Sequence, residues 1–487
     1  MMKYLSKNIY EIHEALVNKK VTPLELVKEA LENIKNDDNN AVEYVYAKEA
    51  IKMAEELSKQ EVEVDNPLWG IPFAIKDNFS TKDIPTTGSS KLLEGYIPSF
   101  DSEIYTRLLN KKAIPIAKTT LDELAMGGTG SSGHLGKTFN PWDKSKTRMI
   151  GGSSCGSAAI VASGIVPFSI GSDTGDSVRK PASYSALVGF KPTWGRISRF
   201  GLFPFAPSLD TVAYFTRNVK ESALLLNVLS GHDDKDTTSS LLEVEDYVSN
   251  LKDSNKPYSV TIIKEIYDDL RDEVIKNAFD KLIANLKEKG YKVNTVSIGF
   301  DLAKAIYSAY YIISSAEATS NNANLDGIRF GVNKAANTYE EMLFKVRTEG
   351  FSDRIRRRFV IGSISLLEEN QQEIYLRALR CRRVIADTFN KILESSDAVI
   401  LPASPTIAPL FGDDIPKKSF NRDATVSDNY LAFANMGGYP SITVPLGFED
   451  NMPFGVNITS HHFTESKLLN IAQAVEDITD LKDLVSK

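Results

Sequence analysis

The chain has 487 residues, of which 42% are hydrophobic and 25% charged, and its formal net charge is −7. This composition is typical of a folded globular protein and leaves room for two or three average domains or for one large α/β unit. The acidic balance argues against a large nucleic-acid footprint, so any nucleic acid would be held mainly by another protein.

Signals for targeting and for disulfide formation are absent from the sequence. The two cysteines, Cys155 and Cys381, have no metal-ligand spacing and form no disulfide framework, which suits a reducing compartment. The amino terminus lacks the apolar core of a signal peptide, and no run of about 18 apolar residues predicts a membrane span. We therefore expect a cytoplasmic protein with no part in the membrane.

The first residues, up to about position 60, predict helices. Thr22 and Glu25 form a capping box around Pro23, which stands at the first helical position. The apolar residues behind this box fall on one helical face: Val27, Ala30, Leu31 and Ile34. An acidic tract over residues 59–66 is typical of a solvated connection.

Residues 71–76 alternate in a way that predicts a strand with Lys76 at its end, opposite the apolar side chains of Ile71, Phe73 and Ile75. Further strands are predicted over 113–117, 259–263, 291–298, 398–401, 442–446 and 454–458. Helical patterns lie between them, notably over 270–289. Strands alternating with helices predict an α/β fold with a large mixed twisted sheet that helices cover on both faces.

Two glycine loops that carry serines, Ser153 and Ser177, follow with an apolar segment between them. Glycine lets backbone N–H groups approach a developing negative charge closely. A serine in such a loop is a candidate nucleophile, and its neighbours' amides are a candidate oxyanion hole. A tight structural turn explains one such loop equally well; two in tandem, ending in Arg-x-Pro-Ala and Lys-Pro-Thr, favour catalysis.

Two other motifs in this region predict different chemistry. Residues 152–156 place a serine between glycines, as in the nucleophile elbow of α/β-hydrolases, but DKSKTRMI before them is a poor strand. The histidines downstream of this motif are His232, His461 and His462. Gly136-Lys137-Thr138 is similar to the end of a phosphate loop, but Ser131 stands where the first glycine is required.

The segment from Gly151 to Ser198 resembles the amidase signature, and LWGIPFAIKDNF supplies the lysine of that family, Lys76. The resemblance covers nearly the whole chain. The later segments SSAEATSNNANLDGIRFG, RIRRRFVIG, DAVILPASPTIAP and NMGGYPSITVPLGF are similar to the subgroup that forms the A subunit of aspartyl/glutamyl-tRNA amidotransferases. We expect one domain over 1–487: a helical part about 1–60, a signature core about 66–216, a helix-rich insertion about 237–394 and a C-terminal core part about 395–487.

The resemblance implies a catalytic set of Lys76, Ser153 and Ser177, in which Ser177 attacks the amide carbonyl and Ser153, in a cis peptide, bridges it to Lys76. A lysine serves as base only if burial lowers its pKa from about 10.4 toward neutrality, and a shift of roughly three units costs about 4 kcal/mol. An exposed lysine at a strand end is the competing interpretation. The expected oxyanion donors are the backbone amides of Thr174, Gly175, Asp176 and Ser177.

The resemblance also implies glutamine as the substrate. Arg358, the last arginine of the run 356–358, would grip the α-carboxylate with its planar fork, although a solvated helix face explains the other arginines. Asp428 would receive the α-ammonium group. Tyr310 would form a wall of the pocket, with Tyr311 as the alternative in the same run.

The implied function is glutamine hydrolysis that supplies ammonia for amidation of Glu-tRNA(Gln), with Asp-tRNA(Asn) as a second acceptor. A partner B subunit would hold the misacylated tRNA and ATP with Mg²⁺, and a small C subunit would link the other two in a heterotrimer. No metal or cofactor is expected in this chain. The alternatives are a stand-alone amidase acting on small carboxylic amides and a catalytically impaired scaffold subunit.

The sequence departs from the family at four positions. Asp176 and Cys155 stand where glycine is usual, Asn324 where the subgroup commonly has arginine, and Lys180 where it often has an uncharged residue. We hypothesise that Asp176 and Lys180, four residues apart, neutralise each other. Cys155 is interpreted as a small residue in a glycine position, with a nucleophilic thiol as the alternative.

Overall fold

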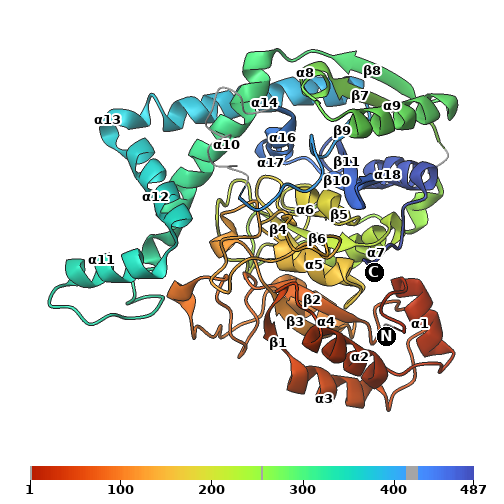
Figure 1. Ribbon diagram of the computed structural model, residues 1–487, viewed down its shortest axis with the longest axis horizontal. Helices are drawn as coiled ribbons and strands as arrows, with labels where there is room; N and C mark the ends of the chain where they lie inside the picture. Colours follow the sequence, from red (N-terminus) through yellow and green to blue (C-terminus); the bar gives the residue numbers. More distant parts are fainter. Residues whose placement is uncertain (1–2, 254–255, 413–425, 487) are drawn as a thin grey trace.

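The computed structural model describes residues 3–253, 256–412 and 426–486. Within them, strands form one 11-stranded sheet in the order β1-β3-β2-β4-β6-β5-β10-β11-β9-β7-β8. The strands are β1 (Val42–Val45), β2 (Pro72–Lys76), β3 (Ile114–Thr119), β4 (Phe168–Asp173), β5 (Val188–Lys191), β6 (Thr211–Thr216), β7 (Ser259–Ile263), β8 (Lys292–Val296), β9 (Ala398–Pro402), β10 (Ser441–Glu449) and β11 (Met452–Ser460). In Figure 1, β1 lies low in the molecule and β8 at its top.

The sheet is mixed, as the sequence predicted. β2 runs parallel to β3 and β4, and β7 runs parallel to β8 and β9, whereas the other neighbours are antiparallel. Every residue of β2, β4, β6 and β11 is buried, so both faces of the sheet are covered there. The α/β fold class is therefore confirmed.

All the predicted strands are present, although β10 and β11 are longer than predicted. The sequence did not predict β1, β4, β5 and β6. These strands are short, and β4, β5 and β6 are buried on both sides, so they show no alternation of apolar and polar residues. β4 also contains Ser169, Gly171 and Ser172, a composition that is more typical of a glycine-rich loop than of a strand.

The N-terminal helices lie at the bottom of Figure 1: α1 (Ile9–Val17), α2 (Pro23–Lys35) and α3 (Ala47–Leu57). The predicted capping box of α2 is confirmed, because Thr22 Oγ1 accepts from the Glu25 N–H at 3.2 Å and Glu25 Oε2 accepts from the Thr22 N–H at 2.8 Å. The prediction of helices throughout the first 60 residues is wrong at β1, which separates α2 from α3 and pairs with β3.

Helices on the sheet place the serine loops. The α-helices up to the end of the signature core are α4 (Glu103–Asn110), α5 (Cys155–Ala162), α6 (Arg179–Tyr184) and α7 (Val219–Leu229), with 3₁₀ turns η1 (Lys91–Leu93) and η2 (Glu123–Ala125). α5 packs on β2, β3 and β4, and α6 packs on β5, β10 and β11. One serine loop precedes α5, and the other joins β4 to α6.

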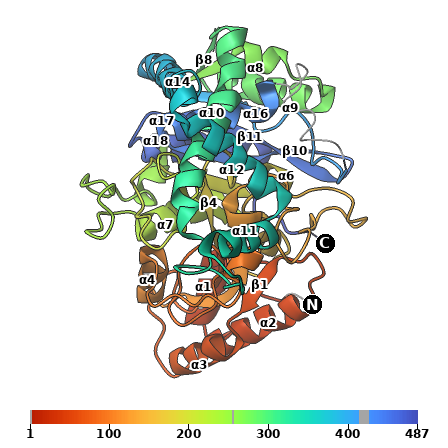
Figure 2. The ribbon, with the colours of Figure 1, turned by 90° about the vertical axis from the view of Figure 1, so that its left-hand side faces the viewer.

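Residues 237–394 supply two strands of the sheet, β7 and β8, and a group of helices. These elements are η3 (Ser249–Asp253), α8 (Lys264–Asp268), α9 (Glu273–Glu288), α10 (Phe300–Asn321), η4 (Asn322–Asn324), α11 (Tyr339–Gly350), α12 (Asp353–Leu366), α13 (Glu368–Gln371) and α14 (Tyr375–Ser395). α10 packs on both α12 and α14. Figure 1 shows α11 and α12 at the left of the molecule, away from the sheet, and in Figure 2 they lie in front of it.

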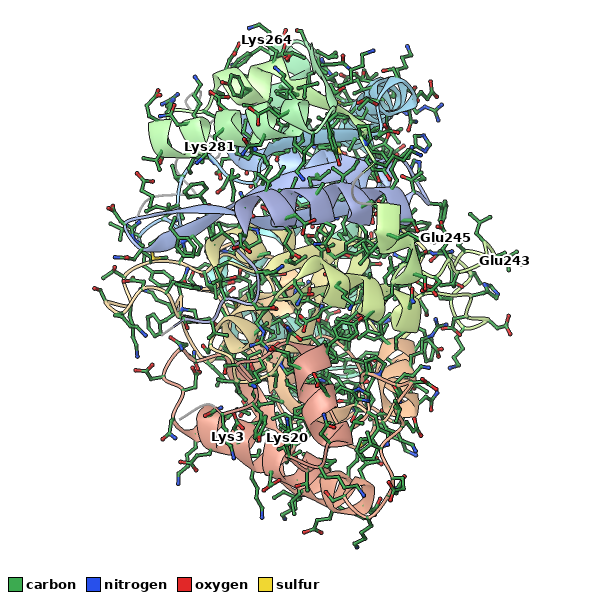
Figure 3. All side chains as sticks on the ribbon, turned by 90° about the vertical axis from the view of Figure 1, so that its right-hand side faces the viewer. Lys3, Lys20, Glu243, Glu245, Lys264 and Lys281 are labelled. Atoms are coloured by element: carbon green, nitrogen blue, oxygen red, sulfur yellow. The ribbon has the colours of Figure 1, made fainter. Side chains whose placement is uncertain are left out.

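The C-terminal part returns to the middle of the sheet as β10 and β11. Its helices are α16 (Val426–Asn429), η5 (Tyr430–Ala432), α17 (Phe433–Gly437) and α18 (Glu465–Thr479). Charged side chains such as Lys264 and Glu243 lie at the periphery of the molecule (Figure 3). No helix in the described ranges is long and apolar enough to span a membrane.

Candidate active site

Lys76 ends β2, and its ammonium group lies among three serine hydroxyl groups. Its Nζ atom lies 2.8 Å from Ser153 Oγ and 2.9 Å from Ser154 Oγ. Ser172 Oγ, on β4, lies 3.0 Å from the same Nζ atom, and Asn78 Nδ2 donates to Ser172 Oγ at 3.1 Å. Because β2 and β4 are parallel neighbours, Lys76 and Ser172 meet at the carboxyl ends of their strands, where α/β sheets commonly bind ligands.

Burial changes the protonation of Lys76. The side chain is 0% exposed, which excludes the alternative interpretation as a surface lysine. Burial lowers the pKa of Lys76 to about 7, although charges nearby, including those of Asp122, Asp173 and Asp210, act to raise it. Near neutral pH a large fraction of Lys76 is therefore uncharged and able to accept a proton.

The two serine loops lie against each other. The Ser154 N–H donates to the carbonyl oxygen of Ser177 at 3.2 Å, and the Gly152–Ser153 peptide bond is cis. Ser177 is 4% exposed, and its hydroxyl group forms no hydrogen bond with the residues that the structure describes. The fold thus brings Lys76, Ser153 and the Ser177 loop into one place.

The loop over residues 174–177 presents backbone N–H groups that have no acceptor within the described ranges. Its conformation is fixed from two sides. Thr174 Oγ1 donates to Asp210 Oδ1 at 2.7 Å, and Arg179 Nη2 donates to the Gly175 carbonyl oxygen at 2.7 Å. Unpaired N–H groups held rigidly beside a serine are the arrangement that stabilises a tetrahedral oxyanion.

A buried ion pair holds the start of this loop. Arg179 Nη2 lies 2.9 Å from Asp173 Oδ1, Arg179 Nε lies 3.1 Å from Asp173 Oδ2, and both side chains are 0% exposed. Burial alone would raise the pKa of Asp173, but the Arg179 guanidinium outweighs it and lowers this pKa to about 2. Asn435, on α17, donates to the Asp173 carbonyl oxygen at 3.0 Å. The end of β4 is thereby fixed to α6 and α17.

Lys180 links two carboxylates beside the Ser177 loop. Its Nζ lies 3.3 Å from Asp176 Oδ2 and 3.1 Å from Asp428 Oδ1. Burial favours the neutral lysine, but Asp428 and Asp176 together raise the pKa of Lys180 above its usual value. The hypothesised ion pair of Asp176 with Lys180 is present, whereas the contact with Asp428 was not predicted. Asp176 has no positive φ, so it fits this glycine position without a left-handed backbone.

Arg358, on α12, is 7% exposed and has no carboxylate partner in the described parts of the chain. Its Nη1 donates to Ser314 Oγ at 3.2 Å, and its guanidinium lies 4.4 Å from the centroid of the Tyr311 ring and 5.1 Å from that of Phe205. A buried guanidinium without an acid partner favours a site for an external carboxylate. Arg356, by contrast, is exposed and pairs with Asp353.

Both tyrosines considered from the sequence border the site. Tyr310 packs on Gly175, since a Cβ atom built there would lie 2.7 Å from Tyr310 Cζ. Tyr311 lies against the Arg358 guanidinium instead. Tyr310 is therefore the residue that touches the Ser177 loop, and Gly175 is required for this close approach.

Cys155 begins α5 beside the first serine loop. Its sulfur accepts from Thr138 Oγ1 at 3.3 Å, and burial raises the pKa of the thiol to about 12. A thiol with such a pKa is a poor nucleophile at neutral pH. This favours Cys155 as a residue that fills a glycine position.

Three features of the site escaped sequence reasoning: Ser172, Asn78 and the buried pair of Asp173 with Arg179. Ser172 precedes the DTGDS loop by one residue, but its partnership with Lys76 depends on the pairing of β2 with β4, which the sequence did not reveal. The hydrolase elbow is excluded as a serine–histidine site, because Ser154 contacts Lys76 and no strand directly precedes Gly152 in the described chain.

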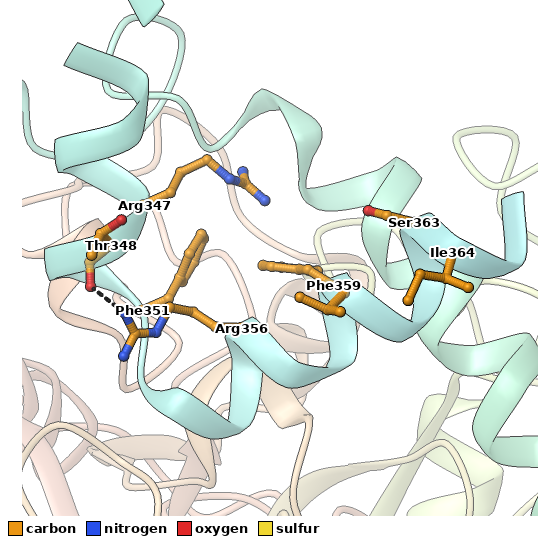
Figure 4. Close-up of a pocket in the computed structure, with 8 residues that line it drawn as sticks. Arg347, Thr348, Phe351, Arg356, Phe359, Ser363 and Ile364 are labelled. Atoms are coloured by element: carbon orange, nitrogen blue, oxygen red, sulfur yellow. Dashed lines mark hydrogen bonds between the residues drawn. The ribbon is translucent and has the colours of Figure 1, made fainter. Parts of the chain in front are cut away.

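A separate groove lies between α11 and α12, with a volume of about 370 Å³. Figure 4 shows it with Arg356 bonded to the Thr348 carbonyl oxygen. The groove is lined by Arg347, Thr348, Phe351, Arg356, Phe359, Val360, Ser363 and Ile364. None of these residues contacts Lys76 or the serine loops. The described ranges contain no cluster of three or more His, Cys, Asp or Glu residues suited to a metal ion.

Comparison with known proteins gives one consistent result. The amidase family model matches residues 25–469. The chain is 39% identical to the A subunit of glutamyl-tRNA(Gln) amidotransferase from Thermoanaerobacter pseudethanolicus, covering 98% of this chain and 97% of that protein. It is 38% identical to the protein of the same name from Streptococcus sanguinis, with the same coverage. The crystal structure of the corresponding A subunit from Thermotoga maritima matches with a TM-score of 0.78 at 32% identity, over 98% of this chain and 96% of that chain.

Proposed function

This chain belongs to the amidase family, and from that premise we propose that it is the glutamine-hydrolysing A subunit of a glutamyl-tRNA(Gln) amidotransferase. The names of the relatives, over nearly the full length of the chain, support this assignment. The observation that carries the chemistry is the buried Lys76, whose pKa lies near neutrality and whose Nζ contacts Ser153 beside the Ser177 loop.

In the proposed reaction, the neutral amine of Lys76 draws a proton from Ser153, which takes the proton of Ser177 as that residue attacks the side-chain amide of glutamine. The negative charge that develops on the amide oxygen is received by the unpaired N–H groups of residues 174–177. Lys76 then returns the proton through Ser153 to the leaving ammonia. A water molecule hydrolyses the γ-glutamyl ester on Ser177 and releases glutamate.

Opposite charges for the two ends of an amino acid support glutamine as the substrate. Arg358 is proposed to bind the α-carboxylate, because its guanidinium is buried and lacks an acid partner among the described residues. Asp428 is proposed to bind the α-ammonium group; its side chain is 38% exposed. Tyr310 forms the wall between these groups and the nucleophile loop.

The proposed partners are a B subunit, which holds the misacylated tRNA and ATP with Mg²⁺, and a C subunit, in a cytoplasmic heterotrimer. The name that the relatives share supports a tRNA-dependent amidotransferase. Glu-tRNA(Gln) is the proposed acceptor of the ammonia, with Asp-tRNA(Asn) as the second acceptor to be compared. The net charge of −7 supports tRNA binding mainly by the partner.

The test is glutamate release from glutamine by this chain purified with its B and C partners, beside Ser177→Ala, Ser153→Ala and Lys76→Met variants. Each substitution is expected to lower kcat by at least about 100-fold, because each removes a part of the proton path or the nucleophile. Ser157→Ala is the matched control, since Ser157 is a buried serine that bonds to Thr119 and not to Lys76.

Three results would contradict the proposal. Hydrolysis of small carboxylic amides without glutamine hydrolysis would identify a stand-alone amidase. A complex that assembles and binds tRNA but releases no glutamate would identify a scaffold protein. Retained activity in the Ser177→Ala variant would show that the nucleophile is assigned wrongly.

A further inference from the structure

Asp176, Lys180 and Asp428 form an ion network whose charges do not cancel. Two carboxylates face one ammonium group, so the network carries one excess negative charge. The Lys180 side chain is 9% exposed, whereas those of Asp176 and Asp428 are 26% and 38% exposed. The buried cation therefore sits behind two more accessible acids.

Asp428 has one carboxylate oxygen available for a further cation. Lys180 contacts Oδ1, and no residue in the described ranges donates to Oδ2. A second ammonium group can therefore bind at Oδ2 while Lys180 keeps its contact with Asp176. Each acid would then have one cation, which leaves the network neutral.

The network and Arg358 lie around the same aromatic residues. Burial raises the pKa of Tyr307. The charges of Arg358 and Lys180 act to lower this pKa, and the charge of Asp176 acts to raise it. Burial likewise raises the pKa of Tyr310, which Arg358 lowers and Asp176 raises. Tyr310 also touches Gly175 of the nucleophile loop. An accessible excess of negative charge and a guanidinium without an acid partner among the described residues thus flank one wall of the site.

On the basis of the proposed function, we propose that Asp176 offsets the charge of Lys180 and thereby maintains the preference for an amide donor that carries an α-ammonium group. Asp176 balances Lys180 and leaves the negative charge of Asp428 to the substrate. Without Asp176, Lys180 would neutralise Asp428 and repel the incoming ammonium group. Asp176 is therefore a specificity-determining residue as long as Lys180 is present, and neither side chain is a member of the proton path.

The charge of the network gives an expected order for the variants. Asp176→Asn leaves one carboxylate and one ammonium group, with no excess charge. Lys180→Gln leaves two carboxylates, and the double variant restores one excess negative charge. Preference for the ammonium-bearing substrate should therefore be lowest in Asp176→Asn and close to wild type in the double variant.

The experiment measures ammonia release by the assembled complex from glutamine and from glutaramate, which has the same amide and carboxylate but no α-ammonium group. Asp176→Asn should lower the ratio of kcat/KM for glutamine to that for glutaramate by about tenfold, mainly through a higher KM for glutamine. Adding Lys180→Gln should restore the ratio to within about threefold of wild type.

Asp387→Asn is the matched control, because it removes the acid of another i,i+4 pair, with Arg383 on α14, away from the site. The ratio of kcat/KM for glutamine to that for glutaramate should be the same in this variant as in the wild type. If Asp176→Asn fails to fold, Lys180→Gln alone tests the inference, since its ratio should equal or exceed that of the wild type.

Equal losses for both substrates in Asp176→Asn, or no restoration in the double variant, would overturn this inference while leaving the glutaminase function intact. A ratio below wild type in Lys180→Gln would also overturn it. Absence of glutamine hydrolysis by the wild-type complex would instead overturn the proposed function, and the inference with it.

Discussion

The environment of Lys76 differs strongly from the one that a lysine side chain has in water. Its Nζ contacts the hydroxyl groups of Ser153, Ser154 and Ser172, and in the described structure no carboxylate pairs with it. Hydroxyl groups accept a hydrogen bond from an ammonium group and donate one to a neutral amine. The same contacts therefore serve both protonation states, which is what a residue acting first as base and then as acid requires.

The lowered pKa of Lys76 predicts the pH dependence of the reaction. Below about pH 7 the lysine is protonated and cannot accept a proton, so kcat/KM for glutamine should rise about tenfold per pH unit and level off above pH 7. Ammonia release measured from roughly pH 5.5 to 9 tests this.

If kcat/KM does not change with pH, or rises only near the usual lysine pKa, the role of Lys76 as base is contradicted. In the Ser172→Ala variant the rise of kcat/KM should occur at lower pH, because the substitution removes one acceptor that stabilises the charged lysine. Ser157→Ala serves as the buried-serine control, and its kcat/KM should rise at the same pH as that of the wild type.

The residues proposed for catalysis could be selected from the sequence for a local reason. Ser153 and Ser177 stand in glycine loops, and Lys76 ends an alternating strand, so their identity follows from short motifs and a family resemblance. Ser172 and Asp428 could not be assigned their partners in this way. Their contacts with Lys76 and Lys180 join residues 96 and 248 positions apart, which only the folded sheet brings together.

At the scale of elements, the residue composition of a strand decided whether the sequence could predict it. β7 and β9 contain enough β-branched and aliphatic residues to be recognised, whereas β4 carries two serines and a glycine. β4 nevertheless positions Ser172 and the loop over residues 174–177, so a strand that builds the candidate site has a weak sequence pattern. The ends of helices were easier to predict, because a capping motif consists of only a few neighbouring residues.

The capping box of α2 provides a test at this scale. Thr22→Ala removes the side chain that accepts from the Glu25 N–H, so it should lower the free energy of unfolding by about 1 kcal/mol. Urea unfolding measures the change, and Thr22→Ser, which keeps the hydroxyl group, should restore most of it. Glutamine hydrolysis should be unchanged; a loss of activity would show that α2 influences the site.

Across the whole molecule, buried and partly buried carboxyl groups join segments that are distant in the sequence. Glu476, on α18, is 3% exposed and accepts from the Val219 N–H at the start of α7 at 2.8 Å. Asp483 accepts from Asn8 at 3.1 Å and from Asn218 at 2.7 Å. The C-terminal residues are thereby tied to α7 and to the N-terminal segment.

Glu476 also predicts how stability depends on pH. Burial raises its pKa from 4.5 to about 7, so the folded state binds a proton more tightly than the unfolded chain. Its contribution to stability is complete below pH 4.5 and is lost as the pH rises through about 7. Glu476→Gln cannot ionise, so its melting temperature should fall less than that of the wild type between about pH 5 and 8.

Differential scanning calorimetry of both proteins tests this prediction, because other titrating groups, including Lys76, contribute equally to the two curves. Glu243→Gln, at an exposed acid, is the control and should follow the wild type. Parallel curves for wild type and Glu476→Gln would show that this carboxyl group does not keep its proton in the folded state.

The burial of Cys155 has a practical consequence for studies in solution. This thiol is 1% exposed with a pKa raised to about 12, whereas Cys381, the other cysteine of the chain, lies partly exposed on α14. Maleimide reagents need an accessible thiolate, so they should react at Cys381 and spare Cys155. A fluorophore could therefore be attached at one known position of the natural sequence, and assembly with the partner proteins could be followed without introducing any substitution.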